Sequence, residues 1–182
     1  AVEIDPVLAA ALPETVNARH DRPERFAVAQ FDALKLAHHE LAVPPALGYF
    51  VPTFLVANLP YNVAVPALLT ALELLPSLKV IDVMVQLEVA ERLAAPPGSR
   101  VYGVPSVKTA WYAEATRGPL ISRSVFWPVP NVDSALVRFE RRPAPDAERS
   151  EVFAIIDAAF SQRRKTLRQA LAGWAGSPAR AE

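Results

Sequence analysis

The segment from Phe54 to Tyr61 constrains the fold of this chain more than any other. Its first four residues are apolar, and Asn58, Leu59, Pro60 and Tyr61 follow directly. A short apolar run that ends at a proline is typical of a buried parallel strand, because proline interrupts both helices and strands. Ligands of open α/β sheets bind at the carboxyl ends of such strands. Pro60 lacks a backbone N–H and restricts the backbone of Leu59 to extended conformations, so we expect the turn to be stiff.

This turn offers a specific chemistry. The Asn58 side chain and the Leu59 carbonyl can accept hydrogen bonds from an exocyclic amine, while the Tyr61 ring stacks on the base that carries it. The alternative is a plain strand-ending turn with a buried Tyr, and the tetrapeptide by itself does not decide between the two.

Strand-like and helix-like segments alternate along the chain. This alternation, with an antiparallel pair closing one edge, favours a doubly wound α/β domain over residues 1–142. The hydrophobic patterns predict strands at 1–4, 26–30, 54–57, 80–85, 124–126 and 134–139, of which the last two form a hairpin. They predict helices at 5–13, 65–75, 86–93 and 101–118.

A small helical domain is predicted over residues 143–182, after a linker at 141–150 that is rich in Pro and charge. Its apolar residues share one helical face. A basic cluster lies beside that face, and we expect it to contact an RNA backbone, although charge runs more often form a solvated surface. The apolar residues are Phe153, Ile156, Phe160, Leu167, Leu171 and Trp174, and the basic ones are Arg163, Arg164, Lys165 and Arg168, with Arg138 and Arg141 near the base of the domain.

Composition narrows the function classes. The 182 residues contain no Cys and have a formal net charge of zero, which excludes a disulfide framework and gives no global attraction to nucleic acid. No apolar run is long enough to span a bilayer, and the first residues do not resemble a signal peptide. We therefore expect a cytoplasmic, monomeric protein. His38, His39 and Glu40 have no third ligand at suitable spacing, so we expect no metal site.

Acidic side chains follow the first two predicted strands. Glu3 could accept hydrogen bonds from ribose hydroxyls and Asp32 from an adenine amino group. Either residue alone could equally be a helix-start acid favoured by the helix dipole. Their order, with Asn58 at the next strand end, makes a nucleotide site the better interpretation.

Four stretches together resemble motifs of the rRNA adenine N6-dimethyltransferases, the KsgA/RsmA family. These are Asn58–Tyr61, Gln86–Leu93, Phe126–Ser134 and Ala159–Arg168. They span almost the whole chain, so chance is not a serious alternative source of the match. The chain departs from the family pattern at Asn131, where Lys is usual, and at Ala110, where Gln is usual.

The resemblance implies a Rossmann-like class I methyltransferase fold that uses S-adenosyl-L-methionine. It implies N6-dimethylation of two adjacent adenosines near the 3′ end of small-subunit rRNA, with the immature small ribosomal subunit as partner. A large-subunit methyltransferase of the erythromycin-resistance type and a non-catalytic nucleic-acid-binding relative remain alternatives. The implied catalytic residues are Asn58, Leu59, Pro60, Tyr61 and Phe126, and the implied cofactor-binding residues are Glu3, Ile4, Asp32, Ala33 and Asn58.

One part of that fold has no counterpart in the sequence. The family places a strand and a Gly-rich turn before the first acidic residue, whereas all six glycines here lie at Gly48 or later. We therefore expect a fragment of a longer enzyme, with a sheet interrupted between the strands at Val2 and Leu55 and with weak cofactor binding.

Overall fold

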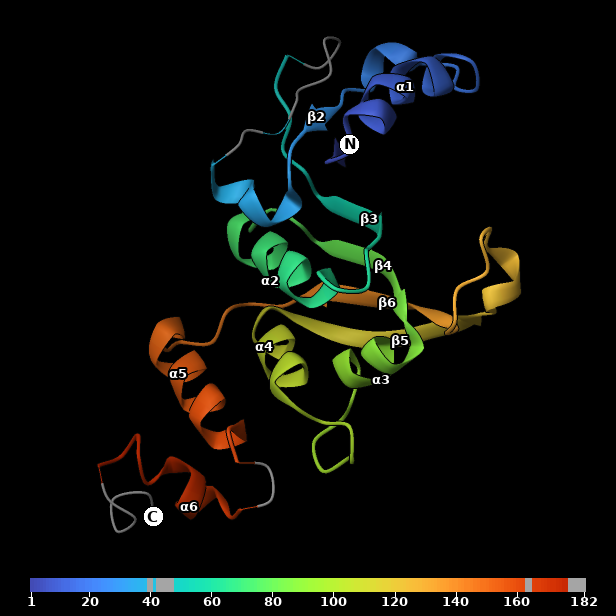
Figure 1. Ribbon diagram of the computed structural model, residues 1–182. Helices are drawn as coiled ribbons and strands as arrows, with labels where there is room; N and C mark the ends of the chain where they lie inside the picture. Colours follow the sequence, from blue (N-terminus) through green and yellow to red (C-terminus); the bar gives the residue numbers. More distant parts are fainter. Residues whose placement is uncertain (39–40, 42–47, 163–164, 177–182) are drawn as a thin grey trace. The chain divides into compact units, whose positions relative to one another are not determined.

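The computed structural model describes residues 1–38, 41, 48–162 and 165–176 (Figure 1). The chain forms two compact units. Unit 1 comprises Ala1–Leu55 and Leu59–Lys79, and unit 2 comprises Val56–Asn58 and Val80–Glu182. The strands form two separate sheets, one of β1 and β2 and the other in the order β3-β4-β6-β5, so the predicted interruption of the sheet is confirmed.

Unit 1 begins with β1 (Val2–Glu3), α1 (Pro6–Asn17), η1 (Pro23–Arg25), β2 (Ala29–Gln30) and η2 (Ala33–His38). The Asp5 carboxylate caps α1 by accepting from the N–H groups of Val7 and Leu8, and Pro6 occupies the first turn, as the sequence predicted. The expected end of this helix at Pro13 is wrong, because α1 continues to Asn17. Pro13 lies on the exposed side, where a carbonyl that loses its helical partner can bond to water.

The strand β3 (Phe54–Asn58) lies at an edge of its sheet, and the prediction that it is buried is wrong, since Phe54 and Val56 are exposed. The segment after it forms α2 (Ala64–Leu74). Its buried residues recur at helical spacing and give unit 1 much of its core. The predicted helix over 65–75 is therefore confirmed to within a residue at either end. The buried positions are Ala64, Ala67, Leu68, Ala71 and Leu72.

Unit 2 is built on a sheet in which β6 (Ser134–Arg141) is the middle strand of an antiparallel set. It pairs with β4 (Val80–Gln86) on one side and with β5 (Ala113–Ile121) on the other. Alternate residues are buried, which places one sheet face under α3 (Leu87–Leu93) and α4 (Val104–Tyr112) (Figure 1). The core of this face consists of Ile81, Val83, Val85, Ala135, Val137 and Phe139.

Two predictions for unit 2 are wrong. Residues 101–118 do not form one helix, since α4 ends at Tyr112 and the chain becomes extended at Ala113 to start β5. Residues 124–126 are not a strand but belong to a 3₁₀ turn, η3 (Arg123–Val125), and the residue that follows it. The hairpin partner of β6 is therefore β5, with a bulge between Arg117 and Leu120. Gly118 and Pro119 oppose a helix here, and pairing with β6 outweighs the helical preference of residues 113–117.

The C-terminal helices α5 (Arg149–Phe160) and α6 (Leu167–Leu171) belong to unit 2. The Phe153 ring of α5 meets the Trp111 and Tyr112 rings of α4 edge-on, with centroids 5.9 and 6.1 Å apart. Lys108 pairs with Asp157 at 2.8 Å. Phe153 of the predicted apolar face thus packs on α4, but the prediction of one continuous face is wrong, because α5 and α6 are separate helices and Leu167 and Trp174 are exposed. The predicted domain boundary after residue 142 stays a prediction.

Candidate active site

The acidic part of the site lies in unit 1, at one edge of the β1–β2 sheet. The strands are parallel, with Glu3 opposite Gln30, so Glu3 ends β1 and Asp32 follows β2 by two residues. Parallel strands bring their carboxyl ends to the same edge, and the structure therefore brings these two carboxylates to one edge. Ile4 and Ala33, the other predicted cofactor contacts, each follow directly after one of them.

Both carboxylates are oriented by the main chain. Glu3 Oε1 accepts a hydrogen bond from the Asp5 N–H at 2.9 Å, and Asp32 Oδ1 accepts one from the Leu34 N–H at 3.0 Å. The sequence interpretation of Asp32 as a helix-start acid is thus also true, since it begins η2. Two acidic residues, Glu3 and Asp5, lie close together at the end of β1. The Asp5 carboxylate already caps α1, so Glu3 is the one suited to bind a ribose.

The Asn58–Tyr61 turn ends β3. Asn58 is the last residue of the strand and its side chain is exposed, while Leu59 is half-buried. The Pro60 carbonyl accepts from the Val63 N–H at 3.1 Å, which closes the turn directly before α2. The Tyr61 side chain is 36% exposed, so the alternative of a turn with a buried Tyr does not hold.

Phe126 lies in unit 2, in the connection between β5 and β6, which projects from the end of that hairpin (Figure 1). It is half-buried, and the neighbouring Trp127 is 95% exposed. Tyr61 belongs to unit 1, so the clasping of one base between Tyr61 and Phe126 stays a prediction.

A pocket of about 470 Å³ adjoins this connection, and sequence reasoning did not find it. It lies where the start of α3 meets the end of the β5–β6 connection, and the Leu87 N–H donates to the Asp133 carbonyl at 2.9 Å. The stretches Gln86–Leu93 and Phe126–Ser134, which the sequence analysis singled out only as family motifs, therefore line one pocket. The lining residues are Gln86, Leu87, Glu88, Glu91, Arg123, Asn131, Val132 and Asp133.

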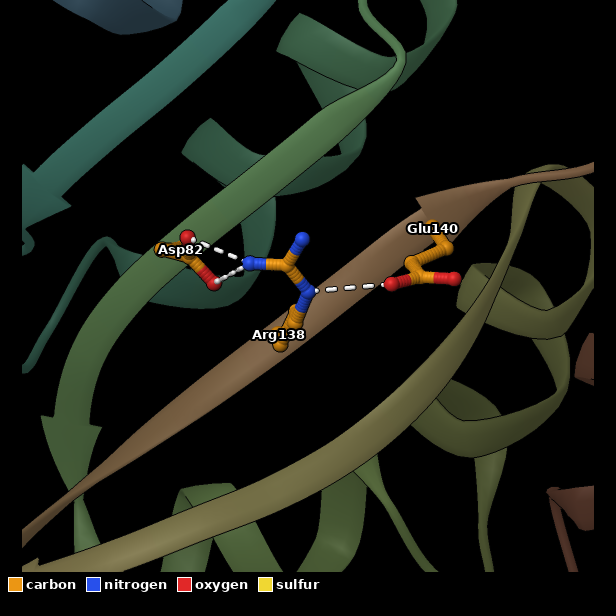
Figure 2. Close-up of polar contacts among 3 residues, drawn as sticks. All are labelled: Asp82, Arg138 and Glu140. Carbon is orange, nitrogen blue, oxygen red and sulfur yellow. Dashed lines mark hydrogen bonds and ion pairs between the residues drawn. The ribbon is translucent and has the colours of Figure 1, made fainter.

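Arg138, a predicted RNA contact, is held between two carboxylates on the open face of the sheet (Figure 2). Its Nη1 lies 3.1 Å from Asp82 Oδ2 and its Nε lies 3.0 Å from Glu140 Oε1. The hydrogen bond to Glu140, followed by the charge of Asp82, raises the pKa of the guanidinium. A phosphate would have to compete with both acids, and the RNA contact of Arg138 stays a prediction.

The other predicted RNA contacts are placed differently. Burial lowers the pKa of Arg141, against a smaller opposing effect of Tyr112. Lys165 and Arg168 are exposed, the latter on α6. Arg163 and Arg164 lie outside the described residues.

The described residues contain no group of three His, Asp or Glu side chains placed to bind a metal ion; His39 and Glu40 fall outside them. Within the same residues, no helix combines the length and apolar character needed to cross a membrane.

Comparison with known proteins matches residues 1–179 to the family model described as ribosomal RNA adenine dimethylase. The "Ribosomal RNA small subunit methyltransferase A" of Kineococcus radiotolerans is 66% identical over the full chain, and that of Streptomyces avermitilis is 61% identical. The chain spans 59% and 60% of the lengths of these two relatives.

Solved structures show the same fold. A dimethyladenosine transferase from Plasmodium falciparum aligns with a TM-score of 0.74 at 22% identity, covering 93% of this chain and 57% of the other. The 23S rRNA methyltransferase ErmE aligns with a TM-score of 0.67 at 25% identity, covering 93% of this chain and 64% of the other. The predicted Rossmann-like methyltransferase fold is thereby confirmed.

Proposed function

The chain belongs to the ribosomal RNA adenine dimethylase family, and on that premise we propose that its protein dimethylates adenine N6 in small-subunit rRNA, with S-adenosylmethionine as methyl donor. The observation that carries the proposal is the exposed Asn58 at the carboxyl end of β3, followed by a closed proline turn. The high identity to small-subunit methyltransferases favours that subunit over the large one.

The chemistry follows from the target amine. The lone pair of adenine N6 is delocalised into the ring, so the nitrogen is a weak nucleophile. Two acceptors, the Asn58 side-chain oxygen and the Leu59 carbonyl, would bind its two hydrogens and favour a pyramidal nitrogen. Such a site acts mainly by positioning the nitrogen in line with the methyl group and by stabilising the positive charge that grows on it.

The bound cofactor would supply an electrophilic methyl group on a sulfonium. N6 would supply the electron pair of the new N–C bond, the cofactor sulfur would leave as a neutral thioether, and N6 would give up one proton for each methyl group gained. The Asn58 and Leu59 oxygens would accept hydrogen bonds from the amine, and its proton would pass from there to water. No strongly basic side chain is needed, because the methylated nitrogen is very acidic before it loses the proton.

The acidic edge of unit 1 suits the nucleoside half of the cofactor. A carboxylate can accept from two vicinal hydroxyls at once, and Glu3 is already oriented by the Asp5 N–H. Asp32 is oriented in the same way by Leu34, which suits acceptance from an adenine amino group. Their common strand-end edge is the structural feature that supports this assignment.

The RNA side of the proposal uses Phe126 as a stacking surface for the target base, an interaction worth about 1–3 kcal/mol. The target adenine has to leave its own stack to reach that ring. Lys165 and Arg168 are assigned to phosphates, since both are exposed cations of the C-terminal segment.

The test replaces Asn58 with alanine in the full-length protein and measures methyl transfer from labelled cofactor to undermethylated small subunits. Loss of one oriented dipole should lower kcat by about 10²- to 10³-fold, with RNA affinity unchanged. Asn62→Ala is the matched control, because Asn62 is an exposed amide in the same turn. Normal turnover of Asn58→Ala would remove the central group from the mechanism, and transfer only to large subunits would favour the erythromycin-resistance type.

A further inference from the structure

The connection from Ser122 to Asp133 carries Phe126, and a small set of polar contacts ties its two ends together. The Arg123 N–H donates to Asp133 Oδ1 at 2.9 Å, and Arg123 Nη1 donates to the Asn131 carbonyl at 3.2 Å. We name Arg123, Asn131 and Asp133 the loop clasp. It joins residues ten positions apart and so closes the connection into a ring at its base.

The loop clasp is continuous with Phe126 on one side. The Phe126 N–H donates to the Arg123 carbonyl at 3.3 Å, and the Val125 N–H donates to the Ser122 carbonyl at 3.2 Å. Arg123 thus uses its N–H to meet Asp133 and its carbonyl to meet Phe126. Any movement of Arg123 away from Asp133 therefore moves the backbone that bears the Phe126 ring.

On its other side the loop clasp is fixed to the core of unit 2. The Asp133 carbonyl accepts from the Leu87 N–H at 2.9 Å, at the first residue of α3. Asp133 also directly precedes β6, whose first residue, Ser134, is buried. Asp133 is therefore the link between a rigid helix–strand junction and the projecting connection.

Apolar packing is a weak alternative means of holding this connection. Val125, Trp127 and Val129 are all exposed, with Trp127 at 95%. Side chains in water contribute little packing energy, so the conformation of the connection depends on its polar contacts. The charged acceptor Asp133 makes the strongest class of these, because a hydrogen bond to an ionised group is stronger than a neutral one.

We propose that Asp133 is a positioning residue for methyl transfer, which acts through Arg123 to hold Phe126 where the target adenine stacks. The proposal rests on the proposed function, since it presumes that Phe126 stacks on the base. Asp133 itself touches neither substrate nor cofactor in this mechanism. Its role is to reduce the freedom of the ring before the base arrives, which lowers the ordering cost at binding and reaction.

The test compares Asp133→Ala, Asp133→Asn, Phe126→Ala and the double variant Asp133→Ala/Phe126→Ala in the full-length protein. Asp133→Ala removes the acceptor and should lower kcat about tenfold, with KM for the cofactor unchanged. Asp133→Asn keeps an acceptor oxygen without the charge and should recover part of that loss. Asp146→Ala, which alters an exposed acid of the segment before α5, is the matched control and should behave as wild type.

The double variant shows whether the activity loss of Asp133→Ala is transmitted through Phe126 or arises elsewhere in the protein. If Asp133 acts through Phe126, adding Asp133→Ala to Phe126→Ala should cost no further activity. Additive losses, or an Asn variant as impaired as the Ala variant, would overturn the proposal.

A readout without turnover completes the design. Amide hydrogen exchange at Arg123 and Phe126 should quicken in Asp133→Ala while that of β6 stays unchanged, and unaltered exchange at these two amides would overturn the proposal. Normal activity of Phe126→Ala together with faster exchange in Asp133→Ala would instead contradict the stacking role in the proposed function and leave the loop clasp as a structural link.

Discussion

Replacing Ser106 with alanine should destabilise unit 2, because its hydroxyl joins two helices in the interior. Ser106 is 3% exposed. Its Oγ donates to the Arg92 carbonyl at 2.5 Å and accepts from the Gly103 N–H at 3.0 Å. The two bonds connect the end of α3 to the start of α4, and α3 carries part of the pocket lining.

The size of the effect follows from what alanine leaves behind. The buried Gly103 N–H loses its partner, at a cost of about 1–3 kcal/mol. The Arg92 carbonyl still accepts from the Ala95 N–H at 3.4 Å, so we expect about 1–3 kcal/mol in total. With an m-value of about 2 kcal/mol/M in urea, the unfolding midpoint should fall by about 0.5–1.5 M at unchanged m.

Ser99 is the matched control. Its Oγ is also buried, but it has no hydrogen-bond partner among the residues that the structure describes. Removing an unpaired buried hydroxyl leaves no group unsatisfied, so Ser99→Ala should be neutral or stabilise by about 1 kcal/mol. The two variants should be measured side by side by urea unfolding followed by circular dichroism. Equal losses in both, or no loss in Ser106→Ala, would refute the reasoning from hydrogen bonds.

Three further predictions concern the core, the RNA surface and a helix cap. Phe139 is fully buried in β6, so Phe139→Ala should cost about 3–5 kcal/mol in urea unfolding, and a loss near zero would show that the site is not packed. Lys165→Ala, which removes an exposed cation, should weaken rRNA binding and reduce the slope of log affinity against log salt by about one. Arg138→Ala should change the slope less, because Asp82 and Glu140 compete for that charge; an equal change in both would contradict this. Hydrogen bonds from the Ser150 hydroxyl and N–H lower the pKa of Glu148, which caps α5. The cap therefore stabilises the folded state at pH values above the unfolded pKa of this carboxyl. The stabilisation is lost as the pH falls through the lower pKa of the folded state. An NMR titration should find the pKa of Glu148 returning toward its ordinary value in Ser150→Ala, and an unshifted wild-type carboxyl would count against the cap.

Local sequence determined the features that depend on neighbouring residues. Asp5 and Pro6 start α1, the apolar spacing over 65–75 gives α2, and the breaker after the apolar run ends β3 at Asn58. Each of these depends on caps, helical periodicity or proline geometry, which act within a few residues. The candidate catalytic turn could therefore be placed at a strand end from the sequence alone.

The tertiary structure decided what depends on partners far along the chain. Within residues 113–121, Gly118 and Pro119 argue locally only against a helix, and the segment forms β5 by pairing with β6. Arg138 has a basic side chain in the sequence, yet the pairing of β6 with β4 places it opposite Asp82 and commits its charge within the protein. The pocket and the loop clasp arise in the same way, because Leu87, Arg123 and Asp133 meet only after the sheet has formed. The physical reason is that strand pairing fixes contacts between segments tens of residues apart, and no periodicity within either segment encodes which partner it will have.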